Sequence, residues 1–147
     1  MAKNMTQREK REAAFLLLYQ MQLNDDLPEE IIENNIAEFG MVTDKTILAT
    51  VTGAAEHSAK ADEIVTRYSK TRAVSRIPKI SVAILRLALY EMDCLPETTL
   101  PDKVAINEAI ELSKKYASEQ DSVFVSGLLG SYYREKQSEK QADKHDE

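Results

Sequence analysis

The segment from Ile80 to Cys94, ISVAILRLALYEMDC, constrains the fold of this chain more than any other feature. Drawn as a helix, it is apolar on nearly every side; apart from Asp93 near its end, Arg86 and Glu91 are the charged exceptions. A helix that lacks a polar face has to be enclosed by other elements. We therefore expect this segment to be the central helix of the core, with further helices packed around it.

Helical periodicity also marks the rest of the chain. Only four glycines and four prolines occur, mostly between periodic segments, which favours long helices joined by short turns over a β-rich fold. Thr6 and Glu9 have the spacing of a capping box at a helix start. Gly53 interrupts the third predicted helix, which is either one long helix or two with a kink. The predicted helices run from Thr6 to the break at Asn24–Asp26, from Pro28 to Gly40, from about Asp44 to Tyr68, from Ile80 to Cys94, from Pro101 to Tyr116 and from Asp121 onward.

The length of the chain indicates one domain. With 147 residues, 43% of them hydrophobic, it can bury one core and is short for a split into two domains. We assign residues 1–137 to a single helical domain. Residues 138–147 are charged and carry almost no apolar side chains, so burial cannot offset the entropy lost on ordering, and we expect a disordered, mobile tail there.

Several features indicate the compartment. The single cysteine, Cys94, can form no internal disulfide, and a lone thiol fits a reducing cytoplasm. The first residues contain no apolar stretch typical of a secretory signal, and there is no run of about eighteen apolar residues that could cross a bilayer. We expect a soluble, cytoplasmic protein with no membrane partner.

The charge distribution is uneven. A net charge of −6 argues against general attraction to nucleic acid. However, residues 1–11 carry four cations against one acid, and residues 64–90 carry six cations and no acid. Two basic segments in an acidic protein indicate a local surface for an anionic partner.

The first basic segment continues into an aromatic stripe. On a helical wheel, the residues that fall within about 80° of one another are Arg8, Arg11, Phe15 and Tyr19. Cations that contact phosphates, next to rings that stack on unpaired bases, are what recognition of single-stranded RNA requires. The alternative interpretation is a solvated helix end followed by ordinary core aromatic residues.

Arg86 lies inside the apolar segment and needs a partner, because burying an unpaired guanidinium is costly. We predict that Glu91 or Glu108 forms an ion pair with it. Glu108 is accordingly interpreted as a structural residue first, and as part of a partner surface second.

Residues that could support catalysis or bind a metal are sparse. His57 and His145 are the only histidines, and Cys94 has no companions at metal-ligand spacing. Gly127 and Gly130 have the spacing of a KH-domain loop, but the apolar residues around them favour a helix with two small residues for close packing. We expect no enzyme activity, no metal and no cofactor.

Four segments carry a family resemblance. They are REAAFLLLYQ (11–20), VAILRLALYEM (82–92), KVAINEAIELSKKY (103–116) and FVSGLLG (124–130). In this order and at this spacing they resemble the successive signatures of the NusB family. The resemblance covers most of the chain, and the second and third segments are the most specific.

The resemblance implies an all-α, compact fold of two packed helical bundles with about six to seven helices. It also implies binding of boxA-type single-stranded RNA in nascent ribosomal RNA transcripts, together with the small-subunit ribosomal protein NusE, in an antitermination complex with RNA polymerase. Arg8 and Arg11 match the family's arginine-rich first helix, and Tyr19 matches its Leu-Tyr position. Tyr68 and Phe124 match aromatic positions near its RNA face. The residues that we expect to bind RNA are Lys3, Arg8, Lys10, Arg11, Tyr19, Tyr68, Arg72, Arg76 and Phe124.

Two positions depart from the family's pattern. Glu9 stands where many members have another basic residue, which bears on RNA affinity rather than on RNA binding itself. Ser126 stands where asparagine is usual, which bears on packing.

Two alternative functions stay open. One is a helical scaffold that binds only protein. The other is a stand-alone relative of the RNA-binding domain that precedes the catalytic part of certain ribosomal RNA cytosine methyltransferases, although this chain has no room for a cofactor-binding α/β domain. The family includes monomers and dimers, so a homodimer is one of two expected states.

Overall fold

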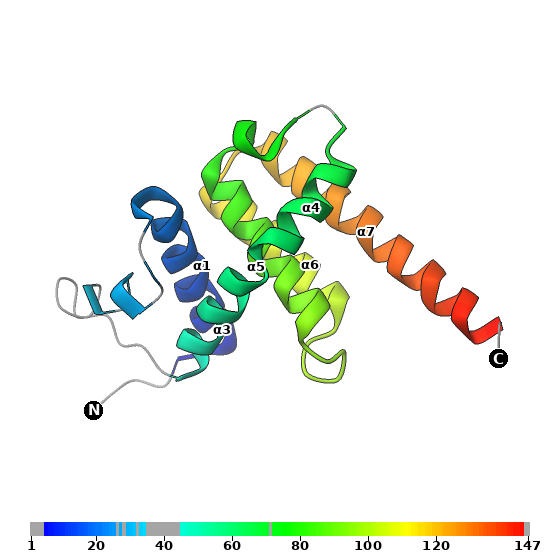
Figure 1. Cartoon of the computed structure of the whole chain (residues 1–147), viewed down its shortest axis with the longest axis horizontal. Helices are drawn as coiled ribbons and strands as arrows, with labels where there is room; N and C mark the ends of the chain where they lie inside the picture. The colour runs from blue at the N-terminus through cyan, green and yellow to red at the C-terminus, as the bar shows by residue number, and fades with distance from the viewer. Residues whose placement is uncertain are drawn as a thin grey trace.

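The computed structural model describes residues 5–25, 27, 29–31, 33–34, 45–70 and 72–145. Within these ranges the chain forms helices and no strand, which confirms the all-helical class. The elements are α1 (Gln7–Asn24), α3 (Lys45–Glu56), α4 (Ser58–Tyr68), the 3-10 helix η1 (Val74–Arg76), α5 (Lys79–Cys94), α6 (Asp102–Tyr116) and α7 (Glu119–His145) (Figure 1). None of these helices is both long and apolar enough to cross a membrane.

Helix α1 begins where the sequence predicts it. Thr6 Oγ1 accepts a hydrogen bond from the Glu9 N–H at 3.0 Å, and Glu9 Oε1 accepts one from the Thr6 N–H at 3.5 Å. This capping box satisfies two amides near the helix start. The helix ends at Asp25, which adopts a left-handed conformation (φ 59°) and donates its N–H to the Met21 carbonyl.

The predicted second helix lies largely outside the described residues. Residues 29–31 and 33–34 are helical, and Ile31 is buried. The predicted ends of this helix, Pro28 and Gly40, lie outside the described residues.

The predicted third helix is two helices. The break falls at His57, between α3 and α4, and not at Gly53. Gly53 lies inside α3, where a Cβ would come within 2.5 Å of Cε1 of the Tyr90 ring. This glycine therefore allows α3 and α5 to approach closely, because it has no side chain.

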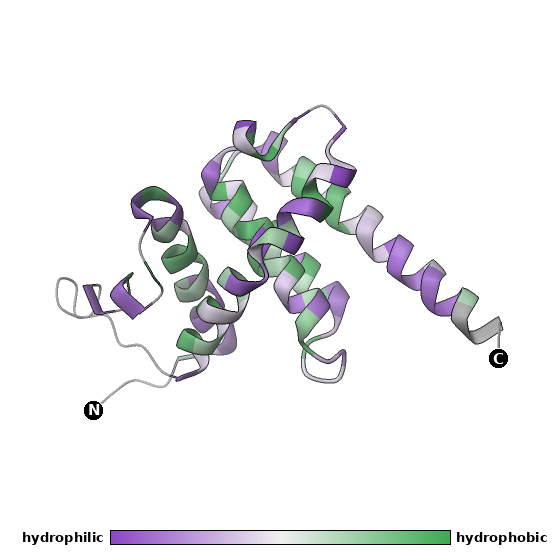
Figure 2. Ribbon diagram, viewed as in Figure 1, coloured by the Kyte–Doolittle hydropathy of each residue, from purple (hydrophilic) through white to green (hydrophobic). Residues whose placement is uncertain are grey.

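Helix α5 is the central helix, as its apolar sequence predicts. It contacts α1, α3, α4, α6 and α7. In Figure 1, α1 and α3 lie on one side of α5, and α6 and α7 lie on the other. Figure 2 shows hydrophobic residues along α5 and on the neighbouring helices, and Leu85 and Leu89 are fully buried. The apolar segment thus joins two groups of helices into one core.

The last helix extends beyond the packed body. Helix α7 continues to His145 and its second half projects from the other helices (Figure 1), whereas the composition predicts a disordered tail from residue 138. This half is hydrophilic (Figure 2), but it is rich in Glu, Lys and Gln, which have high helix propensity. Because it continues a packed helix, no new helix nucleus has to form. The composition of this segment thus favours exposure to solvent, as observed for its second half, but it does not exclude a helix.

Candidate nucleic-acid interface

Both arginines at the start of α1 are bound to carboxylates. Arg8 donates from Nε and Nη2 to the two oxygens of Glu108 at 3.1 and 2.9 Å, and 70% of its side chain is exposed. Arg11, one turn later, is only 12% exposed and donates from Nε to Glu91 Oε2 at 2.9 Å. Its Nη1 also lies 3.7 Å from Glu108 Oε2. The charges of both arginines are therefore compensated by carboxylates.

The burial of Glu91 explains why Arg11 points inward. Glu91 lies on the central helix, and its side chain is 7% exposed. Burial raises the pKa of this carboxyl group, while the charge and hydrogen bond of Arg11 lower it. A buried carboxylate without a cationic partner is strongly destabilising, so Arg11 is a structural residue that joins α1 to α5.

The stripe predicted on α1 faces the core. Phe15 is fully buried, and its ring centroid lies 5.2 Å from that of Tyr116 on α6. Tyr19 is half-buried and packs against the core. Arg11 and Phe15 are therefore not part of an open surface, and Arg8 is the exposed residue of the stripe. RNA contact by Tyr19 stays a prediction.

Lys10 lies beside a groove at the same end of the molecule. The groove has a volume of about 530 Å³ and is lined by Lys10 and Arg11 together with Tyr90 and Leu100. Lys10 is half-buried. Lys3, the remaining predicted cation of this segment, lies outside the described residues.

Arg86 pairs with a carboxylate that the sequence analysis did not select. Its Nε and Nη2 donate to the two oxygens of Asp62 on α4 at 2.9 and 2.7 Å. The predicted pairing with Glu91 or Glu108 is wrong, because these two acids contact the arginines of α1. Glu91 follows Arg86 by five positions, which places the two side chains about 140° apart around α5, so they face different helices.

Tyr68 and Phe124 meet at a shallow groove of about 310 Å³. The guanidinium carbon of Arg72 lies 5.7 Å from the centroid of the Phe124 ring, within the range of a cation–π interaction. Gly127 lines the same groove, and a Cβ built there would meet no atom within 4 Å. Gly127 therefore faces open space, which differs from the close packing expected for it.

The connection between α4 and α5 carries exposed cations. They are Lys70, Arg72, Arg76 in η1, and Lys79 at the start of α5. Among the residues that the structure describes, none of these four forms an ion pair, whereas Arg67 lies 3.5 Å from Glu135. Cations without acidic partners, close to the half-buried rings of Tyr68 and Phe124, are suited to binding the phosphates and bases of a single strand.

The predicted residues form two groups rather than one strip. Figure 1 shows the α4–α5 connection at the opposite edge of the molecule from the start of α1. Tyr19 lies about 16 Å along α1 from Arg8, at 1.5 Å per residue. One group contains Arg8 and Lys10, and the other contains Tyr68, Arg72, Arg76 and Phe124.

Three further residues of this surface were not predicted from the sequence. Lys70 and Lys79 belong to the acid-free segment 64–90, so the charge pattern could have selected them. Val123 lines the aromatic groove and is 69% exposed. No sequence signal marked Val123, because an apolar residue on an amphipathic helix is usually buried.

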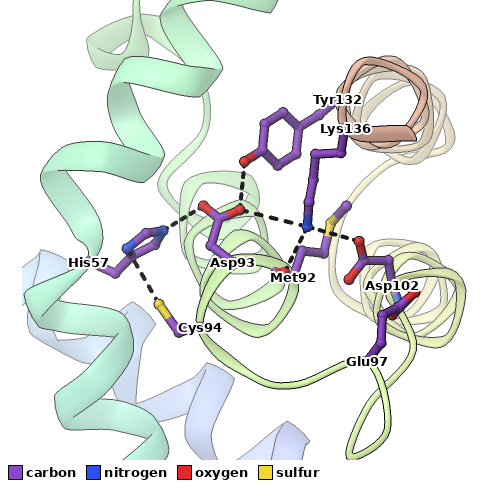
Figure 3. A network of polar contacts seen from close by, with 8 residues as sticks. All are labelled: His57, Met92, Asp93, Cys94, Glu97, Asp102, Tyr132 and Lys136. Carbon is purple, nitrogen blue, oxygen red and sulfur yellow. Dashed lines mark hydrogen bonds and ion pairs between the residues drawn. The ribbon is translucent and has the colours of Figure 1, made fainter. Parts of the chain in front are cut away.

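A second polar network holds α7 to the ends of α5 and α6 (Figure 3). Asp93 accepts a hydrogen bond from Tyr132 Oη at 2.5 Å. Lys136 donates to Asp102 at 2.9 Å and to the Met92 carbonyl at 2.8 Å. Asp102 is buried, so its charge depends on Lys136 for compensation. We interpret this network as structural.

Cys94 lies next to His57 in this network, although the sequence showed no companion for the thiol. His57 Nδ1 is 3.6 Å from Cys94 Sγ, and His57 Nε2 is 2.8 Å from Asp93 Oδ2. Burial, followed by the charge of Asp93, raises the pKa of the thiol. An activated cysteine has a lowered pKa, so the raised pKa of Cys94 argues against an activated nucleophile here. Among the described residues there is no group of three or more His, Cys, Asp or Glu side chains suited to a metal ion.

These observations define an all-helical domain with a candidate nucleic-acid interface made of exposed cations and an aromatic groove. The model of the NusB family matches residues 8–134. The chain belongs to the NusB family, and the resemblance found in the sequence is confirmed.

The relatives support the same assignment. Transcription antitermination protein NusB of Acetivibrio thermocellus is 38% identical over 128 residues, which cover 86% of this chain and 87% of that protein. The structure of T. maritima NusB aligns with a TM-score of 0.73 and 30% identity, covering 88% of this chain and 91% of that one. A crystal structure of antitermination factors NusB and NusE with double-stranded RNA aligns with a TM-score of 0.73 and 26% identity, covering 88% and 98%. The first and the third of these are named as antitermination proteins or factors, and none of the three is named as an enzyme.

Proposed function

We propose that this protein is an antitermination factor that binds single-stranded boxA-type RNA in nascent ribosomal RNA transcripts, together with the ribosomal protein NusE. Family membership supports the role in antitermination, and a similar solved structure contains NusE and RNA. In this proposal the protein acts in the bacterial cytoplasm, as part of an antitermination complex with RNA polymerase. The family includes monomers and homodimers, and light scattering of the free protein distinguishes these two states.

The observation that carries the proposal is the surface formed by the α4–α5 connection and the Tyr68–Phe124 groove. Its exposed cations have no acidic partners among the described residues, so phosphates can bind them without displacing a carboxylate. A base that enters the groove can stack on a ring, which contributes about 1–3 kcal/mol per base. In a protein of net charge −6, this local surface replaces general electrostatic attraction.

The single-stranded form of the RNA is a separate part of the proposal. A ring in a shallow groove can stack only on an unpaired base, because the bases of a duplex are stacked on one another. The similar structure contains double-stranded RNA, so a duplex of the same sequence is the appropriate competitor.

Fluorescence-anisotropy titrations of boxA RNA, with and without NusE, test the proposal. The variant Arg72→Gln/Arg76→Gln is compared with Lys114→Gln/Lys140→Gln, since all four side chains are exposed and each pair removes two charges. We expect the first pair to weaken binding and to reduce the slope of log K against log salt by about 1.4, at about 0.7 per contact with single-stranded phosphate. The control pair should leave both quantities close to wild type.

Two results would contradict the proposal. If the two double variants have equal affinities and equal salt slopes, the RNA phosphates do not bind at Arg72 and Arg76. If the wild-type protein failed to bind boxA RNA at low salt in the presence of NusE, RNA binding would be rejected in favour of a scaffold that binds only protein.

A further inference from the structure

Arg8 already holds an anion in the geometry that a phosphate would use. Its Nε and Nη2 donate to both oxygens of Glu108, at 3.1 and 2.9 Å. Such a two-pronged contact is the mode in which arginine binds carboxylates and phosphates alike. The side chain of Arg8 is 70% exposed, so an RNA phosphate can approach the guanidinium only in competition with Glu108.

Glu108 can release Arg8 without becoming an unpaired buried charge. Its side chain is 15% exposed, and its Oε2 lies 3.7 Å from Nη1 of Arg11. Arg11 in turn stays bound to Glu91 at 2.9 Å. If Arg8 rotates toward solvent, Glu108 therefore stays close to Arg11, and the buried pair of Arg11 and Glu91 is undisturbed.

We infer that Glu108 is an internal competitor for an RNA phosphate at Arg8. In the free protein its carboxylate occupies the donors of Arg8, and RNA has to displace it. The inference rests on the proposed function, and it assigns to Glu108 a role in setting RNA affinity that goes beyond holding α6 to α1. The α4–α5 connection has no such competitor among the described residues, so the two groups of cations differ in how they bind RNA.

Glu108→Gln tests the inference, with Glu111→Gln as the matched control. Glu111 lies on the same helix, is 60% exposed and contacts Lys114 at 3.8 Å, so its replacement removes one nearby negative charge without freeing Arg8. Exposed ion pairs are worth about 0.2–1 kcal/mol, which corresponds to about 1.4- to 5-fold in affinity. We expect Glu108→Gln to bind boxA RNA about 1.4- to 5-fold more tightly than Glu111→Gln does.

The same comparison in an Arg8→Gln background separates competition at Arg8 from a general charge effect. There the advantage of Glu108→Gln over Glu111→Gln should disappear. Thermal unfolding followed by circular dichroism should show Glu108→Gln folded at the assay temperature, because Arg11 keeps Glu91. Glu108→Asp keeps the charge but withdraws the carboxylate by one methylene, so it provides a second variant whose affinity should lie between those of wild type and Glu108→Gln.

The outcomes are distinguishable. If wild type binds RNA but Glu108→Gln and Glu111→Gln have equal affinity, the competitor role is overturned while the proposed function stands. An advantage of Glu108→Gln that persists at full size in the Arg8→Gln background also overturns it. Absence of RNA binding by the wild-type protein overturns the proposed function and the competitor role together.

Discussion

Replacing Arg11 with methionine separates the structural role of this arginine from a role in RNA binding. Arg11→Met keeps most of the apolar stem but removes the guanidinium that binds Glu91 at 2.9 Å. The side chains are 12% and 7% exposed, so the pair is buried, and removing one partner of such a pair costs about 3–5 kcal/mol. Domains of this size are stable by about 5–15 kcal/mol in total, so Arg11→Met should lose a large part of the stability.

The control is Arg8→Met, which removes an arginine from the same turn of the same helix. The side chain of Arg8 is 70% exposed, and exposed ion pairs contribute about 0.2–1 kcal/mol. Urea unfolding at pH 7, followed by circular dichroism, should therefore show a small loss for Arg8→Met and a loss several times larger for Arg11→Met. Arg11→Met/Glu91→Leu should recover most of the loss, because no buried carboxylate is left without a partner.

The pH dependence of Arg11→Met gives an independent check. Burial raises the pKa of Glu91 above its ordinary value near 4.5, and Arg11 opposes this shift, so the variant should raise the pKa further. A group whose pKa is raised on folding stabilises the fold while it is protonated, and this contribution is lost as pH rises through the folded-state pKa. The deficit of Arg11→Met should thus shrink as the pH is lowered from 7 toward 4.5. A loss below about 1 kcal/mol at pH 7, or a loss equal to that of Arg8→Met, would refute the reasoning.

Three further predictions follow from the described contacts. Gly127→Ala should raise the free energy of unfolding, measured in urea, by up to about 1 kcal/mol, because its Cβ meets no atom within 4 Å. Gly127→Leu should fill the groove and weaken RNA binding, and unchanged binding would argue against the groove. Lys136→Met should cost about 3 kcal/mol or more by leaving the buried Asp102 unpaired, and a change in the melting temperature of less than about 2 °C would count against that role. Hydrogen bonds from Lys115, then Tyr116, lower the pKa of Glu12, so Glu12→Gln should be less stable than wild type at pH 7; the gap should close as pH falls below about 4.5, and a constant gap would contradict this.

Local features of the fold could be predicted from the sequence. The Thr6–Glu9 capping box and the apolar segment from Ile80 to Cys94 each encode their structure within a few turns of helix, and both are observed. The break at His57 was not predicted, because Gly53 offered the stronger local signal. Gly53 instead lies within α3, where the Tyr90 ring leaves no room for a side chain. The local sequence pattern therefore predicted where the helices lie better than it predicted where they end.

The candidate site was only half predictable, because charge pairing depends on the tertiary fold. The partners of Arg8 and Arg11 are 100 and 80 positions away in the sequence, so counting cations overstated the positive charge at the start of α1. Helical periodicity placed Arg11 and Phe15 on one face but did not say that this face is buried. Phe124 was predicted through the family resemblance and Arg72 through the charge pattern of residues 64–90, and the structure places the two side chains next to each other.

Binding of single-stranded RNA across the α4–α5 connection is tested most directly by mapping backbone amide chemical shifts during a titration with boxA RNA. The largest changes should occur in the α4–α5 connection and in α7 from Val123 to Ser131, with smaller changes around Arg8. Changes confined to the projecting half of α7 or to the network around Asp93, with the α4–α5 connection unaffected, would contradict the proposed interface.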